Sequence, residues 1–355
     1  MTNVCAQVAA ILCNMMLCSL PNNDFSFSEL LCSNQSFQIT KLCCFLNYFR
    51  RLSLLSMDEP KGKIRFVRST ISGHFNWRKC QRPLTSLKVH TEGQMLDANP
   101  ATNLHVVPAY KNTGGGMLFR RCTPEEAHLC NRPELCIAMI VVPPLGDLEA
   151  LHMSGAERYN ETAKAGLHLS FIADHKDMSP KADDGLSFAA TMVAIDACKF
   201  DDYKDSSIPQ QISRENMQRD LDKGYVAFRG TAENRVSGLD CVSCSSWGQG
   251  APYRGEQEVK VLLLWMAASA NEKSLEYYSH GVIEILQASD LKSLVEAAIK
   301  NEYTVSDLYM ALAELSASQL TREQLFPSLL DHVAIGIGDH QADDDDADDL
   351  FEPDG

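Results

Sequence analysis

Short apolar runs of β type alternate with longer runs of helical spacing from about residue 86 onward. The β-type runs are 104–107, 136–142 and 191–196, and the helical runs are 259–269 and 291–300. The second and third β-type runs are apolar almost throughout, which is typical of strands buried on both faces. We therefore expect a layered α/β domain with ligand loops at one edge of its sheet.

The N-terminal part of the chain has a helical pattern instead. From about residue 4 to residue 55, apolar residues recur at helical spacing, and Arg50 and Arg51 stand where a helix would end. Examples of this spacing are Ile39, Leu42, Cys43, Leu46 and Phe49. We expect an α-helical accessory segment here. Residues 57–86 are expected to form a connecting region that packs in part on the α/β domain.

The apolar first twenty residues and the cysteines bear on the cellular compartment. No Lys or Arg precedes the apolar start, and Gln7 and Asn14 interrupt it, so we expect a soluble helix rather than a signal peptide or a membrane span. The 13 cysteines are odd in number and scattered, which favours reduced thiols in the nucleus or cytoplasm. Cys241 and Cys244 form a single CxxC without a second pair at zinc spacing, so we expect no metal there.

The net charge of −15 is distributed unevenly. Residues 339–355 contain nine acids and no Lys or Arg, so the rest of the chain has 38 acids against 32 bases. Such a mildly acidic body argues against a broad nucleic-acid groove. We expect residues 336–355 to be a solvated, disordered tail, with partner binding as the alternative.

A run of three glycines at 114–116 is followed after seven residues by Pro124-Glu125-Glu126. Consecutive glycines allow the backbone to approach a phosphate or a ribose closely. Thr123 and Pro124 are typical of a helix start, which would place both carboxylates in the first turn. The pattern suits a ligand site with an acid beside it, and it also suits a purely structural turn before a helix.

Further blocks in the same order accompany this motif. They are Lys88–Gly93, Asn131–Leu135, Gly155–Tyr159, Val193–Ala197, Trp247–Ala251, Val259–Tyr278 and Tyr303–Tyr309. Together with the glycine and acid motif, these blocks resemble the catalytic region of the poly(ADP-ribose) glycohydrolase family over roughly residues 40–335. The resemblance implies a macrodomain, in which a mixed sheet between helices binds ADP-ribose. The expected organisation is a helical accessory region and connector at 1–85, the macrodomain at 86–335 and the acidic tail at 336–355.

The resemblance also implies an activity, which is hydrolysis of the ribose–ribose O-glycosidic bonds of poly(ADP-ribose) with release of ADP-ribose. On the family pattern, Glu126 is the general acid/base and Glu125 positions the substrate ribose. A neighbouring carboxylate and partial burial would keep a proton on such a Glu. The implied substrate-binding residues are Gly114, Gly115, Gly116, Gly248, Gly250, Ala251 and Tyr253. No metal or other cofactor is expected.

The implied partners are poly(ADP-ribose), ADP-ribose and poly(ADP-ribosyl)ated proteins, in carbohydrate metabolism and the DNA damage response. Neither direct DNA binding nor membrane binding is expected. His105 and His128 lie near the motif, but a lone His is more often structural. Asp196, at a predicted strand end, is expected to hold a loop.

Several positions depart from the family pattern, and four of them belong to the expected pocket. Val107 and Tyr110 stand where the family has Asp and Asn, Pro124 replaces a Gln, and Ser246 replaces an Asn. Lost polar contacts would weaken binding by roughly 1–3 kcal/mol each. The alternative function is therefore a catalytically weak or inactive relative that only binds ADP-ribose or its polymer.

Overall fold

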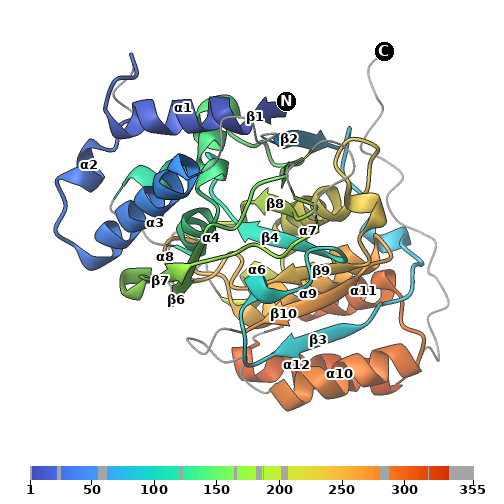
Figure 1. The fold of residues 1–355 in the computed structure, drawn as a ribbon. Helices are drawn as coiled ribbons and strands as arrows, with labels where there is room; N and C mark the ends of the chain where they lie inside the picture. The colour runs from blue at the N-terminus through green and yellow to red at the C-terminus, as the bar shows by residue number, and fades with distance from the viewer. Residues whose placement is uncertain are drawn as a thin grey trace, which may run out of the picture.

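The computed structural model describes residues 2–21, 25–54, 62–119, 123–163, 166–180, 186, 188–200, 207–279, 288–318 and 320–335. The described residues form a mixed eight-stranded sheet between helices, as the resemblance implied (Figure 1). In spatial order the strands are β1 (Thr2–Val4), β2 (Lys63–Thr70), β5 (Glu149–Ser154), β8 (Thr191–Ile195), β4 (Asn103–Pro108), β9 (Cys241–Cys244), β10 (Ser274–Tyr278) and β3 (Leu87–His90). A separate hairpin joins β6 (Asn160–Ala163) to β7 (Ser170–Asp174).

Strand directions place several loops at one edge of the sheet. The strands β8, β4, β9, β10 and β3 are mutually parallel, whereas β5, β2 and β1 are added by antiparallel pairing. The carboxyl ends of parallel strands meet at the same edge. The segments that follow β4, β8 and β9 therefore lie together, and they include the glycine run at 114–116.

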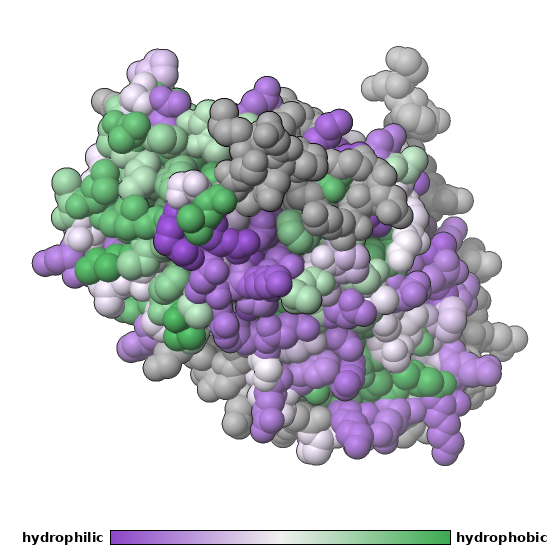
Figure 2. Space-filling view, viewed as in Figure 1, coloured by the Kyte–Doolittle hydropathy of each residue, from purple (hydrophilic) through white to green (hydrophobic). Residues whose placement is uncertain are grey.

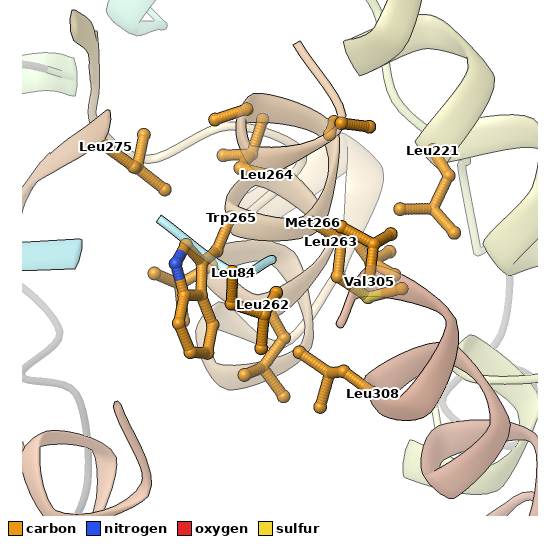
Figure 3. Close-up of a cluster of buried hydrophobic side chains, with 14 of the residues drawn as sticks. Leu84, Leu221, Leu262, Leu263, Leu264, Trp265, Met266, Leu275, Val305 and Leu308 are labelled. Carbon is orange, nitrogen blue, oxygen red and sulfur yellow. The ribbon is translucent and has the colours of Figure 1, made fainter. Parts of the chain in front are cut away.

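Helices cover both faces of the sheet. Along β8, Val193 and Ile195 face one core cluster, whereas Met192 and Ala194 face the other. The first cluster packs the sheet against α7 (Arg214–Phe228), α9 (Gln257–Ser269), α10 (Ala288–Lys300), α11 (Val305–Leu315) and α12 (Leu325–Ile335). Every side chain of α9 is buried, and Figure 3 shows its residues against side chains of α7, α11 and β10. The helices predicted at 259–269 and 291–300 are thus confirmed.

The second cluster joins the other face of the sheet to the N-terminal helices. These are α1 (Cys5–Met16), α2 (Ser28–Leu31) and α3 (Ser36–Ser53), which pack with α4 (Pro124–Asn131). The helical segment is confirmed, and Arg50 and Arg51 lie in the last turn of α3 as expected. Apolar colour gathers on the surface over these helices (Figure 2), where Leu31, Ile39 and Leu46 are exposed.

The strand predicted at 136–142 is wrong. Residues Pro133–Ile137 form the 3₁₀ helix η5 and Ala138–Val141 form α5, with Cys136, Ile137 and Ala138 fully buried. A short apolar run fits a buried helical turn as well as a buried strand, and here η5 packs against α1.

Part of the predicted connector has another role. Its residues 63–70 form β2, which lies inside the sheet between β1 and β5. Ile64 and Phe66 alternate inward along it, which is a strand pattern. Trp77, from the same region, packs into the first core cluster as expected.

Three further expectations concern the cysteines, the membrane and the tail. The cysteines in the described ranges are free, including Cys241 and Cys244 on β9. Among the described helices, none is long and apolar enough to cross a membrane. The predicted tail at 336–355 lies outside the described residues.

Candidate active site

The acid pair opens α4. Pro124 occupies the first helical position, where its missing N–H costs nothing. Glu126 accepts hydrogen bonds from the backbone N–H and the hydroxyl of Thr123, which forms a capping box. Both Glu125 and Glu126 are fully buried. The helix start and the acids of its first turn are thus where the sequence predicted them.

Glu125 is held by the loop that follows β4. Its carboxylate accepts hydrogen bonds from the Gly114 N–H at 2.7 Å and the Tyr110 N–H at 3.3 Å. Burial raises the pKa of Glu125 well above its ordinary value, and the neighbouring Glu126 carboxyl raises it further, whereas the two backbone donors act in the opposite direction. Glu125 therefore retains its proton more tightly than an isolated Glu would.

Glu126 has one carboxylate oxygen that is buried without a hydrogen bond among the described residues. Its Oε2 accepts the bonds from Thr123, but its buried Oε1 has no hydrogen-bond partner in the described part of the chain. This oxygen lies against Gly116, where a Cβ would come within 1.9 Å of Oε1. Residue 116 must therefore be a glycine for the carboxylate to take this place.

The glycine run makes a tight turn beside the acids. Gly114 has φ of 84°, a left-handed conformation that favours glycine, and Gly115–Leu118 form the 3₁₀ helix η4. The Met117 N–H donates to the Gly114 carbonyl at 3.0 Å. The turn thus closes on itself and presents Gly115 and Gly116 to a cleft.

This cleft has a volume of about 1240 Å³, enough for a nucleotide-sized ligand. Its walls come from four parts of the chain: the region of α2, the loop after β4 with the glycine turn, the loop after β8, and α8 (Gly250–Tyr253). The lining residues are Ser28, Glu29, Cys32, Tyr110, Lys111, Asn112, Gly115, Gly116, Phe119, Asp196, Ala197, Lys199 and Tyr253. The α2 wall was not predicted, and no sequence signal marks it.

The second glycine loop, after β9, packs behind the cleft. Gly248 has φ of 69°, and a Cβ there would lie 2.7 Å from the Cβ of Ala197. Gly250 and Ala251 begin α8, and Gly250 is exposed. Tyr253, at the end of α8, lines the cleft.

Tyr253 also pairs with a residue that departs from the family pattern. Its hydroxyl donates to the Ala109 carbonyl at 2.8 Å, and its ring stacks on Tyr110 with centroids 5.7 Å apart. The two rings form an aromatic wall of the cleft. Val107, in contrast, is fully buried in the second core cluster and does not line the cleft.

Buried ion pairs brace the loop after β8. Asp196 pairs with Arg219 and, at 2.7 Å, with Lys223, both from α7. Asp220 pairs with Lys260 of α9. Asp196 thus holds a loop, as expected, and it also lines the cleft.

The histidines do not join the acids. His105 is buried in β4, and its pKa is lowered to about 3 by burial first and by Arg132 second, so the ring is neutral. His128 lies in α4 and is also buried. Neither ring lines the cleft, and the described ranges contain no group of side chains suited to a metal ion.

One residue near the site was missed. Lys41 of α3 is fully buried and donates to carbonyls of the glycine turn. A signal was present, because a Lys four residues from both Phe37 and Phe45 lies on the same helix face as these aromatics.

Comparison with known proteins agrees with the fold. A family model described as poly(ADP-ribose) glycohydrolase, macro domain fold, matches residues 74–287, and one described as the helical domain of the same family matches residues 4–68. Poly(ADP-ribose) glycohydrolase 1 of Arabidopsis thaliana is 27% identical, with 85% of this chain and 65% of the relative covered. Poly(ADP-ribose) glycohydrolase 1 of Caenorhabditis elegans is 25% identical, with coverage of 85% and 38%.

A third relative, the probable poly(ADP-ribose) glycohydrolase 2 of Arabidopsis thaliana, is 25% identical over 89% of this chain and 69% of its own length. The chain spans less than two thirds of the first two relatives. The macro-domain model alone covers more than half of the chain. The chain therefore belongs to the poly(ADP-ribose) glycohydrolase family and has its macrodomain fold.

Proposed function

We propose that this chain hydrolyses the ribose–ribose O-glycosidic bonds of poly(ADP-ribose) and releases ADP-ribose, with Glu126 as general acid/base. The observation that carries the proposal is the Oε1 atom of Glu126, which is buried, lacks a hydrogen-bond partner in the described residues and lies against the cleft-lining Gly116. The names of the curated relatives support the substrate.

The acid pair suits the chemistry of such a bond. Cleavage passes through an oxocarbenium-like state and needs an acid to protonate the leaving ribose oxygen. Burial, and next the neighbouring Glu126 carboxyl, raise the pKa of Glu125, so the site disfavours a second negative charge beside Glu126. Glu126 would donate a proton from Oε1 to the leaving oxygen and then accept one from the attacking water.

The remaining predicted residues have roles in binding. Glu125 fixes the backbone of Tyr110 and Gly114, and so shapes the turn that would hold the ribose. Tyr253 would cover the ligand. Binding of the diphosphate by backbone N–H groups of the second glycine loop stays a prediction, because Gly248 and Gly250 are not among the described residues that line the cleft.

A second candidate function is binding without catalysis. It is favoured by the aromatic ring of Tyr110 on the cleft and by Val107 in the core, because the family has polar residues at both places. Each missing hydrogen bond would cost roughly 1–3 kcal/mol of affinity. Weak binding of ADP-ribose would then be the whole function.

Release of ADP-ribose from purified poly(ADP-ribose) tests both functions. Glu126→Gln should lower kcat by about 10²–10⁴-fold, because it removes the proton donor. The matched control is Glu134→Gln, which changes another buried acid whose carboxylate accepts from the Glu157 N–H and the Tyr159 hydroxyl and not from Thr123, and it should keep kcat within about threefold. Polymer retained on a filter without any release would identify a binding module. Neither retention nor release would refute both functions.

We further propose that poly(ADP-ribosyl)ated proteins are the partners and that the chain acts in the nucleus or cytoplasm, in the DNA damage response. These proposals follow from the proposed substrate and from the scattered cysteines. Cell fractionation before and after DNA damage, with polymer levels measured in each fraction, would test them. Polymer levels that do not respond to loss of the protein would contradict them.

A further inference from the structure

Lys41 extends from the helical segment to the glycine turn. It lies on α3, its side chain is fully buried, and its Nζ is 3.1 Å from the carbonyl oxygen of Phe119, 3.2 Å from that of Met117 and 3.4 Å from that of Gly116. These three carbonyls belong to η4 and the residue after it. One ammonium group therefore contacts three carbonyls of the glycine turn, which comprises residues 114–119.

A buried ammonium is costly unless its N–H groups are paired. An ammonium has three donors, and the turn offers three carbonyls within reach. The C-terminal end of a helical turn also carries partial negative charge, which favours a cation there. Lys41 is thus stabilised by this one arrangement of the carbonyls, and it stabilises that arrangement in return.

The carbonyl contact with Gly116 connects Lys41 to the acid. Gly116 lines the cleft, and the Glu126 Oε1 atom lies against the same residue, at the place where a Gly116 Cβ would stand. A rotation of the Gly116 peptide would move the chain either onto Oε1 or away from it. The distance between the acid and the cleft therefore depends on how this peptide is held.

We propose that Lys41 is a positioning residue for Glu126, and that it acts by fixing the carbonyls of the glycine turn from the helical segment. This inference rests on the proposed hydrolysis and names a residue that would control its rate. It also gives the helical segment a part in the site, because the region of α2 forms a wall of the same cleft.

The test replaces Lys41 by Met, which has similar length but no donors. The matched control is Lys273→Met, because Lys273 is a buried lysine that donates to the carbonyls of Val236 and Leu239 at the opposite edge of the sheet. Lys41→Gln is the second variant, because the glutamine side chain is shorter than lysine but its amide N–H groups can still donate to some of the turn carbonyls. Kinetic constants are referred to the folded fraction, so that loss of stability alone leaves kcat unchanged.

We expect Lys41→Met to lower kcat by about 10–100-fold with KM within threefold, because a displacement of about 1 Å near the reacting atoms has effects of this size. Lys41→Gln should fall between Lys41→Met and the parent, and Lys273→Met should keep the parent kcat. Hydrogen exchange of the peptide 114–119 should be at least tenfold faster in Lys41→Met and unchanged in Lys273→Met. If only Lys41→Gln folds, its kcat should be at least fivefold below the parent.

An unchanged kcat in the folded Lys41 variants would overturn the proposal, and so would unchanged exchange of the 114–119 peptide. A parent protein that releases no ADP-ribose would refute the proposed function instead. In that case the exchange rate and the affinity for ADP-ribose decide whether Lys41 holds the turn. At least tenfold faster exchange with at least fivefold weaker binding in Lys41→Met would support it.

Discussion

A methyl group added at residue 116 should displace the Glu126 carboxylate from its place beside Gly116. In Gly116→Ala the new Cβ would lie 1.9 Å from the Glu126 Oε1 atom and 3.1 Å from its carboxylate carbon. Real Cβ atoms essentially never come closer than 3.0 Å, so the two atoms must separate by at least 1.1 Å. We expect the carboxylate to move rather than the backbone, because the glycine turn is held by Lys41 and by its own hydrogen bonds.

A shift of about 1 Å in a reacting group lowers the rate by about 10²-fold. We therefore expect Gly116→Ala to reduce kcat for release of ADP-ribose about 100-fold. A movement of Glu126 also disturbs its bonds to Thr123, so the free energy of unfolding should fall by about 1 kcal/mol. Steady-state release from poly(ADP-ribose) and a denaturant titration measure the two effects.

Two other glycines serve as comparisons. Gly238→Ala places a Cβ with nothing within 4 Å, so its kcat should equal that of the parent. Gly115→Ala adds a methyl group to the same turn, but the new Cβ meets only the Asn112 Cβ at 3.6 Å. Its kcat should therefore fall clearly less than that of Gly116→Ala. If folded Gly116→Ala keeps more than a third of the parent kcat, contact between residue 116 and the acid does not limit catalysis.

Two further predictions concern the acids. Thr123→Val removes the hydroxyl donor to Glu126 and the cap of α4, so the free energy of unfolding should fall by about 1 kcal/mol and kcat should fall with it, as chemical denaturation and polymer hydrolysis would measure. Burial raises the pKa of Glu134 to about 7, so its proton stabilises the folded state fully below pH 4.5, and this stability is lost as the pH rises to about 7. The parent should therefore lose roughly 3 kcal/mol of unfolding free energy relative to Glu134→Gln as the pH rises over this range. Equal pH dependence of the two unfolding free energies would contradict the raised pKa of Glu134.

The two central strands of the sheet were predictable because buried parallel strands have a strong pattern. Residues 104–107 and 191–196 are apolar runs of strand length, and they form β4 and β8 at the centre of the sheet. Residues 136–142 have the same composition but form helical turns, because they pack against α1 rather than beside another strand. Composition alone does not distinguish these two kinds of burial.

The helical segment shows a second limit. The apolar spacing correctly predicts α3, but Ile39 and Leu46, which belong to that spacing, are exposed. The packed face includes Phe37, Lys41 and Phe45. Lysine is usually a surface residue, and the burial of Lys41 depends on the carbonyls of the glycine turn, of which that of Gly116 is 75 residues farther along the chain. Partners so distant in sequence are not visible in a local pattern.

The departures from the family pattern also become clearer in three dimensions, because three of them leave the acid where it is. Glu125 accepts a hydrogen bond from the backbone N–H of residue 110, which every residue type except proline has, so Tyr110 does not disturb it. Pro124 stands at the first helical position, where no N–H is needed. Val107 packs in the core beneath the turn. Only the Tyr110 ring faces the cleft, so we expect these substitutions to alter KM for the polymer more than kcat.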